Sequence, residues 1–481
     1  MTGTGRRILA PGRNCWTVKS ARRCAVLIDA AAYFRRLDQA LRLARRSILI
    51  VGWDFDGRIA LRPDGGHGTP QRLGDLLLEL VEARPELEVH ILIWDYSVFY
   101  GPGAALPLLL GGGWQDHPRI HLHLDDRHPL RGAHHQKLVC IDDSLAFAGG
   151  IDLTVGRWDT QCHSAGDPAR IDPDGRPHAP VHDMQMAVDG AAARAVSAVA
   201  RERWRIATGE RLPPVPGDHN AWPHDLAPDF TDTPVAVART APAYGGEPAI
   251  HEGATLALDA LAAARGCIYI EAQYLTAAAI GDRLVEKLSA ADGPEIVVLV
   301  TRSSTGLIER FLMGSNRDRL IRRLMQADRF DRLRVYYPVG PGPAGKGEDE
   351  ILVHAKLIIV DDDFVRIGSS NLNNRSVGLD TECDLAIEAP DDAARRAIAG
   401  LRERLLAEHL GVAPEDVARA TASQGSLVRA IEALNRNPRR LRPFPITGED
   451  GPSTTIPGTG LLDPEHPFEP LRPLWGDRDE S

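Results

Sequence analysis

Residues 133–152 (AHHQKLVCIDDSLAFAGGID) carry the pattern that decides how this chain is organised, and residues 353–371 (VHAKLIIVDDDFVRIGSSN) repeat it. In both stretches a His-x-Lys pair is followed after four residues by Asp, and a glycine-containing turn then precedes Asp or Asn. Each member of the second copy lies 219 residues after its counterpart, as 354 − 135 gives for the histidines. Two full copies in register predict two half-sites that face one reaction. The paired positions are His135 and His354, Lys137 and Lys356, Asp142 and Asp361, and Asp152 and Asn371.

The size and charge of the chain limit its class. With 481 residues it is long for one hydrophobic core, so two domains or two fused halves are expected. The fractions of hydrophobic (43%) and charged (25%) residues are ordinary for a globular protein. The formal net charge of −10 argues against an electrostatic grip on nucleic acid, which needs clustered Lys and Arg. No nucleic-acid partner is therefore expected.

The sequence contains few features that indicate a cellular compartment. The six cysteines form no CxxC pair and no regular framework, which indicates a reducing compartment. The basic N-terminus has no apolar region after it, which argues against a secretory signal. No stretch approaches the roughly 20 apolar residues of a membrane span. We therefore expect a cytoplasmic monomer without a transmembrane segment, either soluble or peripheral on a membrane.

Helical periodicity alternates with continuous apolar runs in both halves of the chain. Apolar residues at three- and four-residue steps predict helices over 29–46 and 71–84, and buried strands follow them at 47–53 and 89–94. The second half repeats this order from a helix at 251–265. Helix alternating with buried strand predicts the α/β class, with two similar halves that each hold a mixed, mostly buried sheet flanked by helices.

Changes in composition mark the predicted boundaries. The N-terminal half comprises residues 1–207 and the C-terminal half residues 247–435. Between them, segment 208–246 is Pro-rich and lacks periodicity, so it is predicted to be a linker. The tail, 436–481, is rich in Pro, Arg and Asp and is predicted to be irregular.

The His-x-Lys pair favours phosphate chemistry over metal binding. In a strand, His135 and Lys137 would project from one face. An ammonium beside an imidazole competes with a metal cation but suits an oxyanion, so neither a metal nor a cofactor is predicted. Two such strands would supply two lysines for the non-bridging oxygens of a phosphodiester. One histidine would attack phosphorus and the other would protonate the leaving oxygen.

The other motif residues have different expected roles. Asp142 and Asp361 lie beyond the strand and are predicted to be structural, in a turn or a salt bridge. Asn371 follows a Gly-Ser turn, where the backbone can approach an anion closely, and is a candidate phosphate ligand. Its counterpart Asp152 occupies the same phosphate-binding position. Because a carboxylate repels phosphate, we expect Asp152 to fix a loop or a lysine there.

A histidine nucleophile benefits from a carboxylate on its second ring nitrogen, because the carboxylate fixes the tautomer. The repeat supplies Asp183 and Glu382, each at the head of the strand that follows its motif. Asp183 is accordingly predicted to be the third member of the site that begins at His135. Asp159 and Asp380 are the fallback candidates.

The duplicated motif and its surroundings resemble the phospholipase D superfamily over about residues 25–430. Among the similar stretches are GGIDL at 149–153, GRWDT at 156–160, HD at 182–183, IEAQY at 270–274 and IGSSNLNNRS at 367–376. The likeness is greatest to bacterial relatives of the eukaryotic two-motif phospholipases D. It implies two α/β halves about a pseudo-twofold axis, an active site at their junction and a ping-pong reaction through a phosphatidyl-histidine. The neighbouring pair Cys162 and His163 has no role in this scheme.

The resemblance implies a phosphodiesterase that cleaves the headgroup from a glycerophospholipid at a membrane surface. Its products would be phosphatidic acid and an alcohol such as choline, and an alcohol in place of water would give transphosphatidylation. The expected roles are nucleophile for His135, general acid and then base for His354, phosphate ligands for Lys137, Lys356 and Asn371, and imidazole-orienting carboxylates for Asp183 and Glu382.

Three alternatives stay open. The nearest is a cardiolipin-synthase-like phosphatidyltransferase, against which the missing transmembrane helices weigh mildly. A nuclease is disfavoured by the acidic balance of the chain. An inactive anion-binding relative is disfavoured because both motifs are complete.

Overall fold

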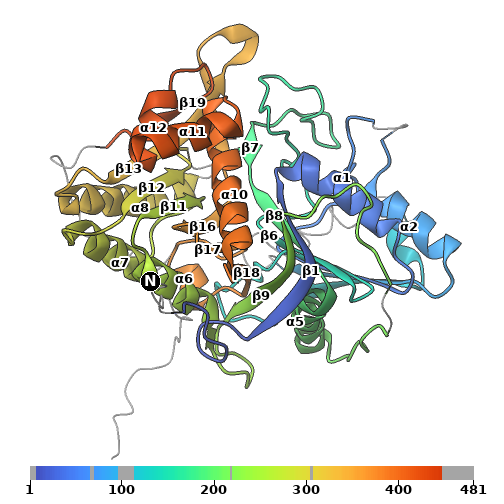
Figure 1. Ribbon diagram of the computed structural model, residues 1–481. Helices are drawn as coiled ribbons and strands as arrows, with labels where there is room; N and C mark the ends of the chain where they lie inside the picture. The colour runs from blue at the N-terminus through green and yellow to red at the C-terminus, as the bar shows by residue number, and fades with distance from the viewer. Residues whose placement is uncertain (1–6, 66–69, 96–112, 217–218, 304–306, 447–481) are drawn as a thin grey trace, which may run out of the picture.

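The computed structural model describes residues 7–65, 70–95, 113–216, 219–303 and 307–446. Two α/β halves lie side by side, the N-terminal half in blue to green and the C-terminal half in green-yellow to red (Figure 1). The predicted α/β class with two similar halves is confirmed.

Seven strands form the main sheet of the N-terminal half. Their bounds are β1 (Thr17–Ile28), β2 (Ser47–Gly52), β3 (Glu88–Trp94), β4 (Ile120–Asp125), β5 (Leu138–Ile141), β6 (Leu145–Gly149) and β8 (Met184–Asp189). Their order across the sheet is β4–β3–β2–β5–β6–β8–β1. Strands β2, β3 and β4 are mutually parallel, and all other neighbours in this half are antiparallel.

Seven strands of the C-terminal half repeat this arrangement. Their bounds are β9 (Phe230–Ala241), β11 (Cys267–Ala272), β12 (Glu295–Val300), β13 (Leu333–Pro341), β16 (Lys356–Val360), β17 (Phe364–Gly368) and β18 (Glu382–Glu388). Their order is β13–β12–β11–β16–β17–β18–β9, again with a parallel trio at the outer end.

The two sheets join where β1 and β9 pair as antiparallel strands, from Thr17 opposite Val237 to Cys24 opposite Phe230. These two long strands lie together in the middle of the molecule (Figure 1). The same strand order thus runs outward in both directions from one antiparallel pair. This is the arrangement that two halves related by a pseudo-twofold axis require.

The helices and short elements complete the fold. The helices of the N-terminal half are α1 (Ala30–Leu41), α2 (Leu73–Ala83) and α5 (Gly190–Thr208), with the 3-10 turn η1 (Trp114–Asp116). Those of the C-terminal half are α6 (Glu252–Ala263), α7 (Ala278–Ser289), α8 (Leu307–Ala327), α9 (Arg375–Gly378), α10 (Asp392–Leu410), α11 (Pro414–Gln424) and α12 (Leu427–Leu434), with η2 (Pro343–Gly345). The short strands are β7 (Val181–His182), β10 (Ile250–His251), β14 (Glu348–Glu350), β15 (Leu352–Val353) and β19 (Arg440–Pro443).

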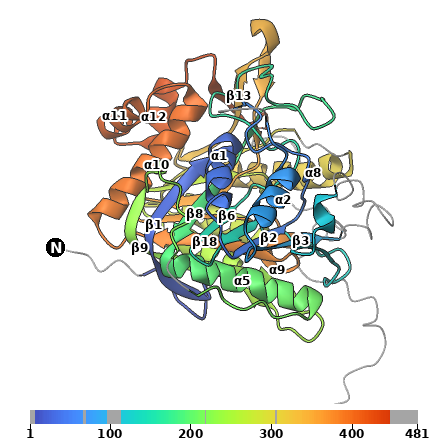
Figure 2. The same ribbon diagram turned by 90° about the vertical axis from the view of Figure 1, so that its right-hand side faces the viewer.

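Apolar side chains on both faces explain why the predicted strands read as continuous hydrophobic runs. In β2, Ile48 and Ile50 pack in the cluster that contains α1 and α2, whereas Leu49 and Val51 belong to a second cluster. That second cluster contains residues of α5 and α10 and joins the two halves. A third cluster lies under α6, α7 and α8. Figure 2 shows α1, α2 and α5 from the side of the N-terminal half.

Three sequence-based expectations differ from the structure. Segment 208–246 is not a linker throughout, because β9 lies within it and pairs with both β1 and β18. In the tail, β19 pairs with β13, while residues 447–481 lie outside the described residues. Strand β5 begins at Leu138, so His135 and Lys137 precede the strand in which they were expected to lie.

Among the described residues, no helix combines the length and the apolar character that crossing a membrane would need.

Candidate active site

Each motif histidine is held by the backbone of the other half. The His135 N–H donates to the Thr381 carbonyl oxygen at 2.9 Å, and the His354 N–H donates to the His182 carbonyl oxygen at 2.8 Å. Around the second contact, β7 and β15 form a two-stranded parallel sheet across the halves. The residues before β5 therefore pair with the other half, which is why His135 and Lys137 do not lie in the predicted strand.

The two predicted carboxylates reach the histidines of the opposite half. A Glu382 carboxylate oxygen lies 3.0 Å from His135 Nδ1, and Asp183 Oδ2 lies 2.6 Å from His354 Nδ1. The expectation that Asp183 completes the set of His135 is therefore wrong. The cause is the cross-half pairing, which places the residue after His182 beside His354 and the residue after Thr381 beside His135.

Both motif lysines are buried beside their histidines. Lys137 Nζ donates to the His135 carbonyl oxygen at 3.0 Å and pairs with Asp152 Oδ2 at 3.0 Å. Lys356 Nζ donates to the His354 carbonyl oxygen at 2.5 Å and to Gln273 Oε1 at 3.2 Å. Burial lowers the pKa of Lys356 to about 7.

Asp152 and Asn371 occupy equivalent places with different partners. Besides Lys137, Asp152 accepts the Trp53 N–H at 2.9 Å, so it holds both a lysine and a loop, as expected for a carboxylate there. The Asn371 N–H donates to Ser376 Oγ at 3.2 Å. Asn371 Oδ1 is buried without a hydrogen-bond partner among the described residues.

The motif aspartates brace the backbone at the far end of the strands. Asp142 accepts N–H groups of Arg45, Arg46 and Ser47, each at 2.8 Å. Asp361 does the same in the second half, with the N–H groups of residues 265, 266 and 267 at 2.7–3.1 Å. Each aspartate ties its motif strand to the start of the neighbouring antiparallel strand, β2 or β11. Their contacts fit the predicted structural role.

The fallback carboxylates do not contact the motif histidines. Asp380 accepts the Ala133 N–H at 2.9 Å and pairs with Arg375 at 2.7 Å. Asp159 lies 2.8 Å from His163 Nδ1.

Burial and neighbouring charge set the protonation of the site. Burial and the adjacent lysines hold the pKa of both His135 and His354 well below the usual range. Burial raises the pKa of Asp183 to about 6 and that of Glu382 to about 8, because an ionised carboxylate loses its hydration there. An incoming phosphate anion would favour the protonated forms of the imidazoles and of Lys356.

Sequence reasoning assigned no role to several neighbours of these groups. Ser369 and Ser376 donate their hydroxyls to Glu382 at 2.5 and 2.6 Å. The Arg157 guanidinium lies near enough to help lower the pKa of His354. Arg157 stands in the GRWDT stretch and both serines in IGSSNLNNRS, so the signal was present in the stretches quoted above. What was missing was the spatial relation.

Comparison with known proteins agrees with this geometry. The family described as "Cardiolipin synthase, PLD-like domain" matches residues 257–402. Phospholipase D alpha 1 of Carica papaya is 25% identical over 570 aligned residues, covering 87% of this chain and 70% of that protein. Phospholipase D A of Dictyostelium discoideum is 25% identical over 471 residues, covering 81% of this chain and 35% of that protein.

Among solved structures, the fold is similar to that of phosphatidylserine synthase from Haemophilus influenzae Rd KW20. The TM-score is 0.55 at 13% sequence identity, and the match covers 86% of this chain and 96% of that one. Two similar α/β halves that share one set of paired histidines, lysines and carboxylates define a class of duplicated phosphodiester-processing proteins. Over most of its length the chain is similar to the phospholipase D superfamily.

Proposed function

We propose that the protein is a phospholipase D-type phosphodiesterase that cleaves glycerophospholipids at a membrane surface into phosphatidic acid and a free alcohol. One observation carries the proposal: each motif histidine has its Nδ1 on a carboxylate of the opposite half, beside a buried lysine. This arrangement offers two imidazoles and two ammonium groups to one phosphodiester, as a double displacement at phosphorus needs.

His135 is assigned as the nucleophile. Its Nδ1 lies 3.0 Å from the Ser369 carbonyl oxygen, which can only accept a hydrogen bond, and near Glu382. The ring proton therefore belongs on Nδ1, and Nε2 of the neutral imidazole keeps its lone pair. Nε2 attacks phosphorus and forms a P–N bond while the bond from phosphorus to the headgroup oxygen breaks.

His354 is assigned as the general acid and then the base. With a pKa of about 6, Asp183 is ionised at neutral pH more readily than Glu382, so it supports an imidazolium at His354. The His354 Nε2 proton passes to the departing headgroup oxygen. The same nitrogen then takes a proton from water, whose oxygen attacks phosphorus. The P–N bond breaks, and phosphatidic acid leaves.

Lys137, Lys356 and Asn371 are assigned to the non-bridging phosphate oxygens. Both lysines are held beside their histidines by backbone carbonyls, so their positions are set before substrate arrives. Asp152 keeps Lys137 in place and does not contact phosphate in this scheme.

A phosphatidyltransferase is the second candidate, because the matching family is described as "Cardiolipin synthase, PLD-like domain". In that reaction a lipid alcohol replaces water in the second displacement, and the residue roles are unchanged. A nuclease is disfavoured by the net charge of −10.

The test offers the purified protein phosphatidylcholine vesicles containing ethanol, phosphatidylglycerol vesicles, and a single-stranded oligonucleotide. Phosphatidic acid together with phosphatidylethanol is the expected result. Cardiolipin from phosphatidylglycerol, with little phosphatidic acid, would favour the transferase. Cleavage of the oligonucleotide with no product from any lipid would overturn the proposal. His121→Ala, at a half-exposed histidine outside the site, is the matched control for His135→Ala and should keep wild-type activity.

A further inference from the structure

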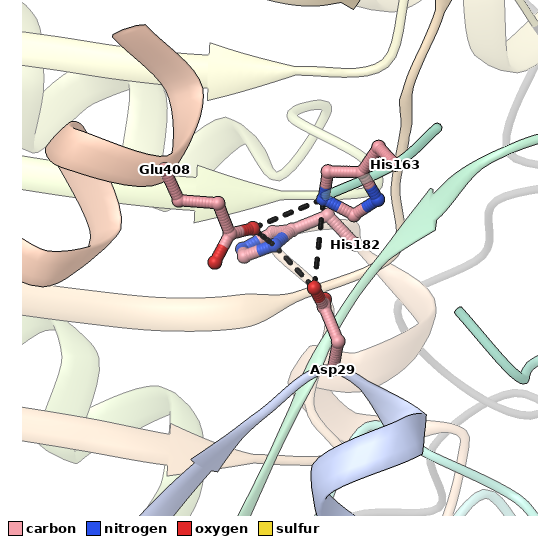
Figure 3. A group of neighbouring side chains, drawn as sticks. All are labelled: Asp29, His163, His182 and Glu408. Atoms are coloured by element: carbon pink, nitrogen blue, oxygen red, sulfur yellow. Dashed lines mark hydrogen bonds and ion pairs between the residues drawn. The ribbon is translucent and has the colours of Figure 1, made fainter. Parts of the chain in front are cut away.

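Three buried histidines and four buried carboxylates form a cluster that the proposed reaction does not use. At its centre are Asp29, His163, His182 and Glu408, and every side chain in this group of four is at most 3% exposed. They come from four separate places: the residue after β1, the loop after the GRWDT stretch, β7 and the end of α10 (Figure 3). One ligand atom of each lies within 4.8 Å of the others.

The spacing of these atoms suits one small cation. Glu408 Oε1 lies 3.0 Å from His163 Nε2 and 2.7 Å from His182 Nδ1. The Asp29 carboxylate oxygens lie 3.1 Å from His182 Nδ1 and 3.5 Å from His163 Nε2. Zinc bonds to nitrogen and oxygen of about 2.0–2.2 Å place tetrahedral ligands about 3.3 Å apart. The group therefore needs only small shifts to hold such an ion.

The outer nitrogens of both imidazoles are also prepared for a metal. His163 turns Nε2 inward while its Nδ1 lies 2.8 Å from Asp159. His182 turns Nδ1 inward while its Nε2 lies 2.7 Å from Glu271. A carboxylate on the second nitrogen fixes the tautomer that binds a metal and raises its basicity.

The carboxylates of Asp159 and Glu271 have further partners that fix their positions. Arg170 lies 3.1 Å from Asp159, and Glu271 receives the Tyr269 hydroxyl at 2.5 Å and contacts His409 Nε2 at 3.0 Å. The imidazoles of His163 and His182 are thus oriented from behind by groups with fixed positions.

The buried carboxylates of the cluster need positive partners. Asp29, Asp159, Glu271 and Glu408 bring four carboxylates into the interior, and among the described contacts Arg170 is the only permanent cation on them. Asp29 Oδ2 and Glu408 Oε2 are buried without a hydrogen-bond partner among the described residues. Buried carboxylates need a partner of opposite charge, which is either a metal ion or protonated imidazole.

The backbone conformation of Asp29 is unusual for a residue with a side chain. With φ 64° and ψ 156°, Asp29 has a conformation that glycine normally occupies. Such a conformation persists only where surrounding contacts impose it. Here it directs a carboxylate toward the two imidazoles (Figure 3).

We propose that Asp29, His163, His182 and Glu408 bind one divalent cation of the zinc type, as a structural ion outside the reacting His–Lys site. The sequence, from the chemistry of the His-x-Lys pair, predicted no metal; the ion proposed here lies outside that pair. The ion would fix β7, whose His182 carbonyl accepts the His354 N–H at 2.8 Å and whose next residue is Asp183. It would thus tie α10 and the end of β1 to the strand that positions one half of the active site.

The first experiment measures the metal content of the full-length protein, purified without chelator, by plasma mass spectrometry. Its melting temperature is followed before and after treatment with 1,10-phenanthroline. We expect about one zinc per chain, and a fall in melting temperature of about 10 °C or more that added Zn²⁺ reverses. Folded protein with less than about 0.1 equivalent of any divalent metal, and no response to Zn²⁺, would overturn the proposal. Protonated histidines would then balance the carboxylates.

A second experiment identifies the ligands. His163→Ala and Glu408→Gln should lose the bound metal, whereas His178→Ala, at a histidine outside the cluster, should keep it. Metal retained at full stoichiometry in both ligand variants would overturn the assignment. If these variants do not fold, the wild-type protein is loaded with Co²⁺ and its visible absorption is measured. Visible absorption of a tetrahedral site with nitrogen and oxygen ligands supports the proposal, and its absence refutes it.

Discussion

The two halves hold their histidines in the same backbone arrangement but support them differently. Glu382, which faces His135, receives two serine hydroxyls. Asp183, which faces His354, receives the Met184 N–H at 2.7 Å and is packed against Gly150, where an added Cβ would lie 2.2 Å from Asp183 Oδ1. Gly150 is the counterpart of Ser369. Where Ser369 donates a hydroxyl to Glu382, Gly150 has no side chain, and the Asp183 carboxylate occupies the space that a side chain would need.

The lysines differ in the same way. Lys137 has a carboxylate partner in Asp152, whereas Lys356 has the neutral amide of Gln273. The comparison indicates that duplication determined the path of the backbone while the side chains around each histidine specialised. It predicts that the two histidines, although equivalent by repeat, perform different steps.

The largest expected effect comes from the histidines themselves. With phosphatidylcholine, His135→Ala and His354→Ala should each reduce kcat by about 10⁴-fold or more, since both act on one substrate. A p-nitrophenyl ester of phosphatidic acid, whose leaving group needs no protonation, separates their roles. His354→Ala should release a stoichiometric burst of p-nitrophenol and retain a phosphorylated histidine, and His135→Ala should do neither. The reverse pattern would exchange the roles, and half of the activity surviving in either variant would refute a shared site.

The carboxylates should show the next largest effect. Glu382→Gln and Asp183→Asn should each lower kcat by about 10²- to 10⁴-fold, because an amide can no longer hold the required tautomer. The p-nitrophenyl ester should restore most of the burst rate in Asp183→Asn, which affects the acid, but not in Glu382→Gln, which affects the nucleophile. Equal recovery of both variants would contradict the assigned difference between the halves.

A smaller effect is expected from the serines that support Glu382. Ser369→Ala or Ser376→Ala should lower kcat by about tenfold with little change in KM, the loss expected for one buried hydrogen bond. Ser370→Ala is the matched control in the same turn, because its hydroxyl donates to Asp384 at 2.6 Å and not to Glu382. A similar loss of kcat in the control would show that the effect is one of packing.

The last prediction concerns the dependence of stability on pH. Burial raises the pKa of Glu382 from 4.5 to about 8, so between these values the folded chain holds a proton that the unfolded chain has released. Stability must then fall as pH rises, by up to about 1.4 kcal/mol per pH unit. Glu382→Gln lacks this contribution, so its melting temperature should rise relative to wild type from pH 5 to pH 8. The surface control Glu79→Gln should follow wild type at each pH, and a parallel course for Glu382→Gln would contradict the prediction.

Much of the fold could be predicted from local pattern, because each buried strand is apolar on both faces and each helix is periodic. Strand β9 could not be predicted in this way. It contains Pro234, which lacks an N–H and argues against a central strand. The structure accommodates it because β18 pairs only with residues 236–240 of β9, so at Pro234 the strand has β1 as its partner on one side.

The residues of the candidate site could be predicted from the sequence, but not which carboxylate contacts which histidine. Repetition identified His135, His354 and their lysines, and the equivalent positions of Asp183 and Glu382 singled out both carboxylates. Which carboxylate meets which histidine depends on the pairing of β7 with β15 and of His134 with Thr381, between strands far apart in the chain. The role proposed for His163 depends likewise on α10, which lies about half the chain away in sequence.

The pairing of β1 with β9 has a consequence for synthesis on the ribosome. Among the described residues, Thr17–Arg23 of β1 have a strand partner only in Thr231–Val237 of β9, since the pairing of β1 with β8 begins at Cys24. Until β9 has been synthesised, this part of β1 has no neighbouring strand. An exposed strand edge can pair with another chain and cause aggregation. Completion of the N-terminal sheet must therefore wait for the first strand of the C-terminal half. The two halves are expected to reach the folded state as one cooperative unit and not in succession.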